Sequence, residues 1–315
     1  MSVPVLLIAF NRPDLAEKTL MRMIEANPSK IYFAVDGARI DKPEELAKVK
    51  QVRNLTSLIP TSIPYEVRFS DTNHGCREGV SSAISWFFSK EESGIILEDD
   101  CFPDLSFFPF CEELLIKYKD DHQIGMISGD NFFRNKIHLK DSYFYSTYFH
   151  IWGWATWRRA WNGYQSTGIQ HEELYSVLSK KFFFKRQILK WYNWINGSSS
   201  GKVDTWDHQW TFHNWKENRI SIMPNVNLIS NIGFRSDGTH TIDENSQLAN
   251  LDLDSIPFPL VHPKKRKLKF LYHIFVEVNY YPNKIYQLVF NLILNYLEFK
   301  SSLLILINGN KGEKF

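Results

Sequence analysis

The first hundred residues alternate short apolar runs with stretches of helical periodicity. The apolar runs are bounded by Gly, Pro and polar residues, which favours buried strands over helices. They span residues 5–10, 31–35, 65–69 and 95–97. Helical character is predicted between them, over residues 13–25, 44–58 and 78–88, and Pro13 is a good first residue for the first helix. Strands alternating with helices specify βαβ units, so we expect an α/β fold with a mainly parallel, Rossmann-like sheet flanked by helices.

Polar side chains follow each predicted strand. They are Asn11 and Arg12, Asp36, Asn73 to Gly75, and the consecutive acids Glu98, Asp99 and Asp100. The carboxyl ends of parallel strands meet at one edge of a sheet, where ligands bind, so these groups are predicted to converge. Three adjacent acids repel one another, and a shared Mg²⁺ or Mn²⁺ with a phosphate-bearing substrate would relieve that repulsion. The alternative is a solvated acidic turn in which Asp104 caps the next helix.

Two further residues suit a nucleotide. Asp36 can accept a hydrogen bond from a base N–H, and Arg77 at a predicted helix start can meet a phosphate. For Asp36 the alternative is turn chemistry beside Gly37. No Gly-x-Gly-x-x-Gly follows the first strand and no Gly-x-x-x-x-Gly-Lys occurs in the chain, so neither a dinucleotide fold nor a P-loop is supported.

Composition narrows the class of partner. The 315 residues carry a formal net charge of +2, which argues against a nucleic-acid partner. Aromatic residues make up 15% and include ten tryptophans, which suits sugar faces or membrane interfaces as well as a core. The three cysteines have no metal-site spacing, and the apolar N-terminus is expected to be a first strand rather than a signal peptide. We therefore expect a reducing, cytoplasmic location.

The order of the motifs resembles the GT-A glycosyltransferases, which have the nucleotide-diphosphosugar transferase fold. It is most similar to the N-acetylglucosaminyltransferase that begins N-glycan branching and to related bacterial sugar-processing proteins. The similarity covers residues 3 to 245. Its motifs begin at Phe10, Asp36, Asn73 and Leu97, and continue at Ile127 (Ile-Ser-Gly-Asp-Asn), Trp152 (Trp-Gly-Trp-Ala-Thr-Trp), Trp206 (Trp-Asp-His-Gln-Trp) and Ser230.

The resemblance implies roles for three acidic residues. It makes Asp100 the metal-binding residue and places Asp99 near the ribose. Asp207 falls in the first turn of a helix predicted to be capped by Thr205, where the helix dipole favours its ionised form. The resemblance gives it the general-base role in an inverting displacement. The alternatives are an Asp207 that only stabilises its helix, or a base supplied by Asp204 or His208.

Two more segments are assigned to the site. Trp152, Trp154 and Trp157 are expected to floor the sugar site, with core packing as the alternative for at least two of them. Residues 233–240 are polar and rich in glycine, as in a lid over a diphosphate, with Arg235 neutralising the leaving group and His240 completing the metal shell or contacting phosphate. The expected nucleotide-sugar-binding residues are Phe10, Asn11, Arg12, Asp36, Arg77, Glu98, Asp99, Trp154 and Arg235.

The character of the chain changes near residue 255. A basic cluster at 264–269 precedes apolar, aromatic segments that extend to residue 307, a pattern typical of binding to an anionic lipid surface. The alternative is a solvated linker followed by a core or dimerisation helix. Charged and amide residues interrupt the segment, which argues against a transmembrane helix. We expect a catalytic domain over 1–255, with a nucleotide-binding half (1–120) and an acceptor half with the lid (121–255), and a helical C-terminal region over 256–315.

Together with these features, the resemblance implies a metal-dependent hexosyl- or N-acetylhexosaminyltransferase. It would move a sugar from a UDP-sugar to a hydroxyl of a growing bacterial surface glycan or glycolipid, with a lipid-linked acceptor at the inner face of the cell membrane as a further hypothesis. One alternative is a sugar-1-phosphate nucleotidyltransferase, although residues 10–14 lack the expected glycine-rich basic loop. The other is a non-catalytic carbohydrate-binding protein, which would leave the acids at 98–100 without a task.

Overall fold

The computed structural model describes residues 2–132, 140–182, 185–235, 246 and 248–268. Its strands are β1 (Val5–Ala9), β2 (Ile31–Val35), β3 (Tyr65–Phe69), β4 (Ser93–Glu98), β5 (Cys101–Pro103), β6 (Ile124–Ser128), β7 (Tyr143–Ser146), β8 (Trp154–Trp157), β9 (Ile220–Pro224) and β10 (Ile229–Asn231). Its helices are α1 (Pro13–Ala26), α2 (Glu45–Asn54), the 3₁₀ turn η1 (Leu55–Leu58), α3 (Gly75–Lys90), α4 (Phe107–Lys117), α5 (Arg158–Trp161), α6 (His171–Lys181), α7 (Lys185–Ser199) and α8 (Asp207–Lys216). The strands and helices predicted over the first hundred residues are confirmed.

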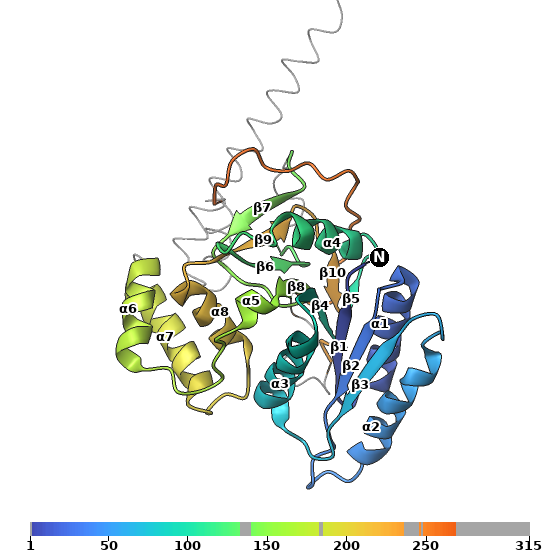
Figure 1. Ribbon diagram of the computed structural model, residues 1–315. Helices are drawn as coiled ribbons and strands as arrows, with labels where there is room; N and C mark the ends of the chain where they lie inside the picture. The colour runs from blue at the N-terminus through green and yellow to red at the C-terminus, as the bar shows by residue number, and fades with distance from the viewer. Residues whose placement is uncertain (1, 133–139, 183–184, 236–245, 247, 269–315) are drawn as a thin grey trace, which may run out of the picture.

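Eight strands of the described residues form one twisted sheet, in the order β3-β2-β1-β4-β8-β6-β9-β7 (Figure 1). The first four strands in this order are parallel, with Val5 opposite both Ile31 and Ile95. Strand β8 runs antiparallel between β4 and β6, and β7 runs antiparallel at one edge. The predicted α/β fold with a mainly parallel sheet is therefore confirmed. A separate pair, β5 with β10, lies directly beyond the carboxyl end of β4.

Each face of the sheet has its own core. Successive residues of a strand point to opposite faces, so Val5, Leu7 and Ala9 join one core while Leu6 and Ile8 join the other. Helices α1, α2 and α4 cover the first face, and α3 with α5 to α8 covers the second (Figure 1). Because both faces are buried, the parallel strands read as continuous apolar runs, which is the signal that the sequence carries.

Residues that follow the predicted boundary at residue 255 still contact the α/β unit. Ile256 and Leu260 are buried, and the backbone amide of Val261 donates a 2.8 Å hydrogen bond to the hydroxyl of Ser142. Arg266, within the basic cluster, forms an ion pair with Asp121. Residues 256–268 therefore pack on the α/β unit, and the rest of the predicted helical region (256–315), from residue 269 onward, lies outside the described residues.

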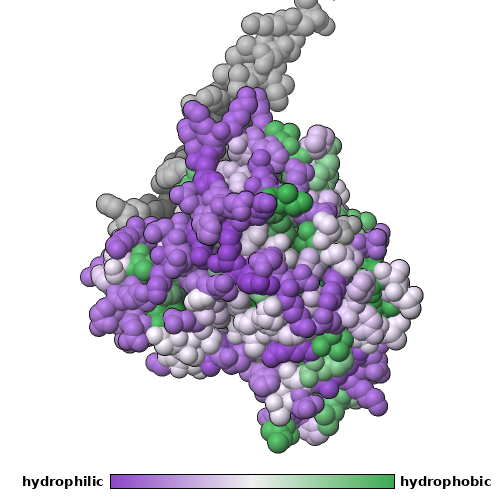
Figure 2. Space-filling view, viewed as in Figure 1, coloured by the Kyte–Doolittle hydropathy of each residue, from purple (hydrophilic) through white to green (hydrophobic). Residues whose placement is uncertain are grey.

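The visible surface is mostly hydrophilic, and its apolar side chains form small separate patches (Figure 2). Within the described residues, no helix is both long enough and apolar enough to span a bilayer.

Candidate functional site

A cavity of about 460 Å³ opens at the carboxyl edge of the parallel strands. Strands β1, β2 and β4 end at this edge, and the start of α8 reaches the same space from the other half of the chain. The structure therefore brings most of the predicted site residues together. Those that line the cavity are Phe10, Asn11, Arg12, Asp36, Glu98, Asp99, Asp100 and Asp207.

Arg12 contacts the acidic cluster directly. Its guanidinium forms an ion pair with Asp99, with Nε 3.4 Å from Oδ2, and its Nη2 lies 2.9 Å from Oδ2 of Asp100. Arg12 is 16% exposed, Asp99 4% and Asp100 13%, so these charges are largely removed from water. Burial lowers the pKa of Arg12, but the attraction of the two carboxylates outweighs this and raises it overall.

The pKa values of Glu98 and Asp99 are both raised, by different amounts. Burial, followed by the negative charges of Asp100 and Asp99, raises the pKa of Glu98 to about 8. Burial also raises the pKa of Asp99, to about 6, although the attraction of Arg12 opposes that shift. The negative charge of Asp207 adds to the rise in the pKa of Glu98, so Asp207 and the acidic cluster interact electrostatically.

The donor set around Asp100 decides whether a divalent cation fits. Within the described residues no three His, Cys, Asp or Glu side chains converge as a closed metal site. Mg²⁺ does not need one, because it is commonly held by one or two carboxylates together with water and substrate phosphates. Asp100 lines the cavity and offers that single carboxylate. The residues fit a cation that shares its coordination with a phosphate, with Arg12 already bound to the same carboxylate.

Asp36 lines the cavity but is already saturated with hydrogen bonds. Its carboxylate accepts from the backbone amides of Gly37 (2.9 Å), His74 (2.9 Å) and Gly75 (3.2 Å), and from the side-chain amide of Asn73 (3.1 Å). A carboxylate has about four lone-pair sites, so little capacity is left for a base N–H. Asp36 thus fastens the loop before α3 to the end of β2, as in the turn alternative, while its contact with a base stays a prediction.

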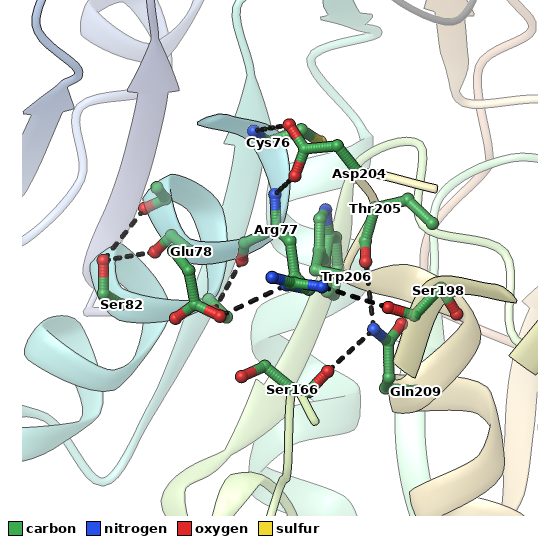
Figure 3. A network of polar contacts seen from close by, with 12 residues as sticks. Cys76, Arg77, Glu78, Ser82, Ser166, Ser198, Asp204, Thr205, Trp206 and Gln209 are labelled. Atoms are coloured by element: carbon green, nitrogen blue, oxygen red, sulfur yellow. Dashed lines mark hydrogen bonds and ion pairs between the residues drawn. The ribbon is translucent and has the colours of Figure 1, made fainter. Parts of the chain in front are cut away.

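The N-terminus of α3 is occupied by a carboxylate of the protein. Asp204 accepts hydrogen bonds from the backbone amides of Cys76 (2.8 Å) and Arg77 (2.9 Å), as Figure 3 shows. The Arg77 guanidinium turns toward α7, where it donates to the carbonyl of Ser198 at 3.2 Å. The prediction that Arg77 binds a phosphate is therefore corrected: its side chain does not line the cavity, and its helix terminus is already capped.

Asp207 is the first residue of α8 and faces the cavity. Trp206, rather than Thr205, is the N-cap of α8, so the predicted helix start was one residue early. The hydroxyl of Thr205 instead donates to the carboxylate of Asp207. This contact fixes one oxygen of Asp207 and leaves the side chain at the cavity surface. His208, a rival base in the sequence, also lines the cavity.

The three tryptophans of the aromatic motif lie in different environments. Trp152 lines the cavity and packs edge-on against Phe234, with ring centroids 5.7 Å apart. Trp154 is 1% exposed and stacks on Trp206, while Trp157 packs on the opposite face of the sheet. The prediction that Trp154 contacts the sugar is corrected. Residues 154–157 form a strand in the middle of the sheet, and both of its faces are covered by core.

The predicted lid is described only at its beginning. Gly233 passes close to the acidic cluster, since a Cβ on it would lie 2.3 Å from Oδ2 of Asp100. Arg235 does not line the cavity, and its guanidinium pairs with Asp14 on α1 at 2.5 Å. Its predicted role beside the diphosphate is thus not seen in this arrangement. His240 and the rest of the segment lie outside the described residues.

Two arginines that line the cavity were not predicted from the sequence. Arg39 lines it beside Glu45, with which it forms an ion pair. Arg68 of β3 also lines it and donates to the hydroxyl of Ser82 at 3.1 Å. The position of Arg68 was a usable signal, because it is one residue from the end of a strand whose parallel neighbours end at the same edge.

Comparisons with known proteins identify no family. No protein-family model and no curated protein matches the chain. Among solved structures, an apo UDP-glucose pyrophosphorylase is similar at 8% identity and a TM-score of 0.36, over 73% of this chain and 93% of that one. The glycosyltransferase GlyE of Streptococcus pneumoniae TIGR4 is similar at 12% identity and a TM-score of 0.28, over 72% of this chain and 55% of that one. Similarities at this level assign neither a family nor an activity.

Proposed function

We propose that the protein is a glycosyltransferase that moves a hexosyl or N-acetylhexosaminyl group from a UDP-sugar to a hydroxyl of a growing glycan, with inversion. The observation that carries the proposal is the shared cavity: Asp207 faces the same space as Arg12 and Asp100. Displacement of a nucleoside diphosphate needs charge compensation at the leaving group and a base at the attacking hydroxyl, on opposite sides of the sugar. The cavity offers candidates for both.

The donor end of the cavity would hold the diphosphate. Arg12 is a permanent cation with a planar donor fork, which matches phosphate oxygens. A divalent cation, Mn²⁺ or Mg²⁺, bound at Asp100 would supply charge compensation for the departing diphosphate. Phe10 and Asn11 lie on the same side, directly after β1.

The acceptor end would be served by the start of α8. Asp207 would take the proton from the acceptor hydroxyl, and the Thr205 hydroxyl would hold its carboxylate in orientation. Trp152, which also lines the cavity, offers an aromatic surface suited to the apolar face of a sugar ring. The proposal extends to a glycan acceptor carried on a lipid at the inner, cytoplasmic face of a bacterial membrane.

One feature of the backbone favours glycosyl transfer over nucleotidyl transfer. Strand β1 ends at Ala9 and α1 begins at Pro13, so three residues connect them. A connection this short leaves little backbone to wrap around a nucleoside triphosphate. It therefore favours a glycosyltransferase over a nucleotidyltransferase. Raised carboxylate pKa values such as those of Glu98 and Asp99 cluster at functional sites and suit acid–base chemistry, which supports an enzyme over a purely sugar-binding protein.

Calorimetry with UDP, with and without Mn²⁺, tests the nucleotide site, and hydrolysis of a panel of UDP-sugars by the purified chain tests the activity. We expect UDP binding that strengthens with Mn²⁺ and slow hydrolysis of one UDP-sugar. Pyrophosphorolysis of a UDP-sugar to UTP would instead identify a nucleotidyltransferase. Sugar binding without any affinity for UDP would identify a binding protein.

A further inference from the structure

The ion pair between Arg12 and Asp100 sits where the proposed function needs a cation. The guanidinium lies 2.9 Å from Oδ2 of Asp100 and at the same time forms an ion pair with Asp99. All three side chains are at least 84% removed from solvent, so the pair is poorly screened by water. Arg12 therefore acts as the internal counter-ion of the cluster.

A cation bound to Asp100 would lie close to the groups that surround its carboxylate. Oδ2 is bounded by Arg12 on one side and by the backbone of Gly233 on another, where a Cβ would come within 2.3 Å. Oδ1 is 3.6 Å from the thiol of Cys101, which is buried. A divalent cation bonds a carboxylate oxygen at about 2.0–2.6 Å. Such an ion at Asp100 would therefore come close to the guanidinium, and two cations at short range in a partly buried site repel strongly.

We propose that Arg12 competes with a divalent cation for Asp100, and that the diphosphate of the bound nucleotide draws Arg12 away so that metal and nucleotide bind as a coupled pair. The inference rests on the proposed function, because it takes the metal and the nucleotide diphosphate from it. The diphosphate provides anionic oxygens for the fork of Arg12, which replace the contact with Asp100 that the metal takes over. Each ligand then raises the affinity of the other by the same factor.

Mn²⁺ binding without substrate turnover tests the proposal. Free Mn²⁺ is measured by its electron paramagnetic resonance signal during titration of the wild-type chain and of Arg12→Gln, each with and without UDP. We expect wild type to bind Mn²⁺ weakly without UDP and at least tenfold more tightly with it. Arg12→Gln should bind Mn²⁺ at least tenfold more tightly than wild type when UDP is absent, and UDP should strengthen its binding of Mn²⁺ by a smaller factor.

Two matched variants separate competition from general effects. Arg68→Gln removes another cavity arginine that does not contact the acids, and should leave Mn²⁺ affinity close to wild type. Asp100→Ala should bind Mn²⁺ poorly, both alone and combined with Arg12→Gln. Arg12→Gln leaves the buried Asp99 without its ion-pair partner, so Arg12→Gln with Asp99→Asn is the variant to use if thermal unfolding shows that the single change destabilises the fold.

The outcomes are distinguishable. If wild type binds Mn²⁺ with UDP but Arg12→Gln gains no affinity without UDP, competition is wrong while the proposed function stands. An equal gain in Arg68→Gln would show only a change in the overall charge of the cavity, and would also overturn competition. If no variant binds Mn²⁺ even with UDP, the metal part of the proposed function fails and the competition fails with it.

Discussion

The carboxylate of Asp204 caps the helix that begins at Gly75, and its Oδ2 lies 2.8 Å from the backbone amide of Cys76. This contact joins the segment between α7 and α8 to the start of α3 (Figure 3), and both segments line the cavity. Gly75 makes the approach possible, because its φ is +77° and a Cβ would lie 2.6 Å from Asp204 Oδ2. The two halves of the cavity are thus held together by a side chain that replaces a local helix cap.

Asp204→Ala should lower the free energy of unfolding by about 1–2 kcal/mol, as expected for the loss of a helix cap. Asp204→Asn keeps one accepting oxygen and should cost less. Denaturant unfolding of the three proteins measures the difference. Gly75→Ala should be destabilising alone and less so when combined with Asp204→Ala, because the clash with the carboxylate is then gone. Strict additivity of the two changes would contradict the proposed contact.

Asp207→Asn should leave UDP affinity unchanged and reduce turnover by about 10²–10⁴-fold, the usual contribution of a positioned base. The substitution keeps the shape and the hydrogen-bonding capacity toward Thr205 while removing the basic oxygen. Initial rates and calorimetry on the same preparation check both expectations. His208→Gln is the matched control, and a larger loss there would move the base to the neighbouring residue. A fall in UDP affinity in Asp207→Asn would make Asp207 a binding residue.

Asp100→Ala should abolish the Mn²⁺-dependent part of UDP affinity, because it removes the proposed carboxylate ligand. The change should leave the fold intact, since Arg12 keeps its ion pair with Asp99. Calorimetry with UDP at several Mn²⁺ concentrations measures the effect, and circular dichroism checks the fold. Mn²⁺-dependent UDP affinity equal to that of wild type would place the metal elsewhere.

Glu98 should make stability fall as the pH rises. The pKa of Glu98 is raised from an ordinary 4.5 to about 8, so between these values the folded chain holds a proton that the unfolded chain has lost. The stabilisation from this proton is fully present below pH 4.5 and is lost as the pH rises toward 8. Glu98→Gln mimics the protonated form and should be more stable than wild type at pH 8, by up to a few kcal/mol. Unfolding curves from pH 5 to 9, without metal or nucleotide, test this. Parallel pH profiles for the two proteins would contradict it.

The basic cluster should bind anionic vesicles weakly and in a salt-sensitive way. Lys264, Lys265 and Lys267 are exposed, while Arg266 is engaged by Asp121. Each free basic residue near an anionic bilayer contributes about 1 kcal/mol, so the three lysines should give measurable co-sedimentation at low salt. Reversing these lysines to glutamate keeps Arg266 in place and should abolish it. A chain ended after Pro263 tests the contribution of everything that follows. Binding that is equal for neutral and anionic vesicles would contradict an electrostatic contact.

The elements around the site could be predicted because their signals are local. Strands buried on both faces appear as apolar runs, and the polar groups that follow them must converge if the strands are parallel neighbours. Arg12, Asp99 and Asp100 were predicted at one edge of the sheet for this reason, and all three line the cavity there. Strand β8 was not predicted, because its tryptophans were assigned to the sugar site, whereas residues 154–157 form a strand in the middle of the sheet.

The sequence by itself determined the fold class and the edge at which polar groups gather, because strand and helix patterns arise from neighbouring residues. Only the tertiary structure decided which group each of them contacts. Arg12 meets Asp99 and Asp100 across 87 and 88 positions, and Asp204 caps α3 across 127 and 128. A buried charge or helix terminus must find a partner, but many residues could supply one. The packing of distant elements selects among them, and no local pattern records that selection.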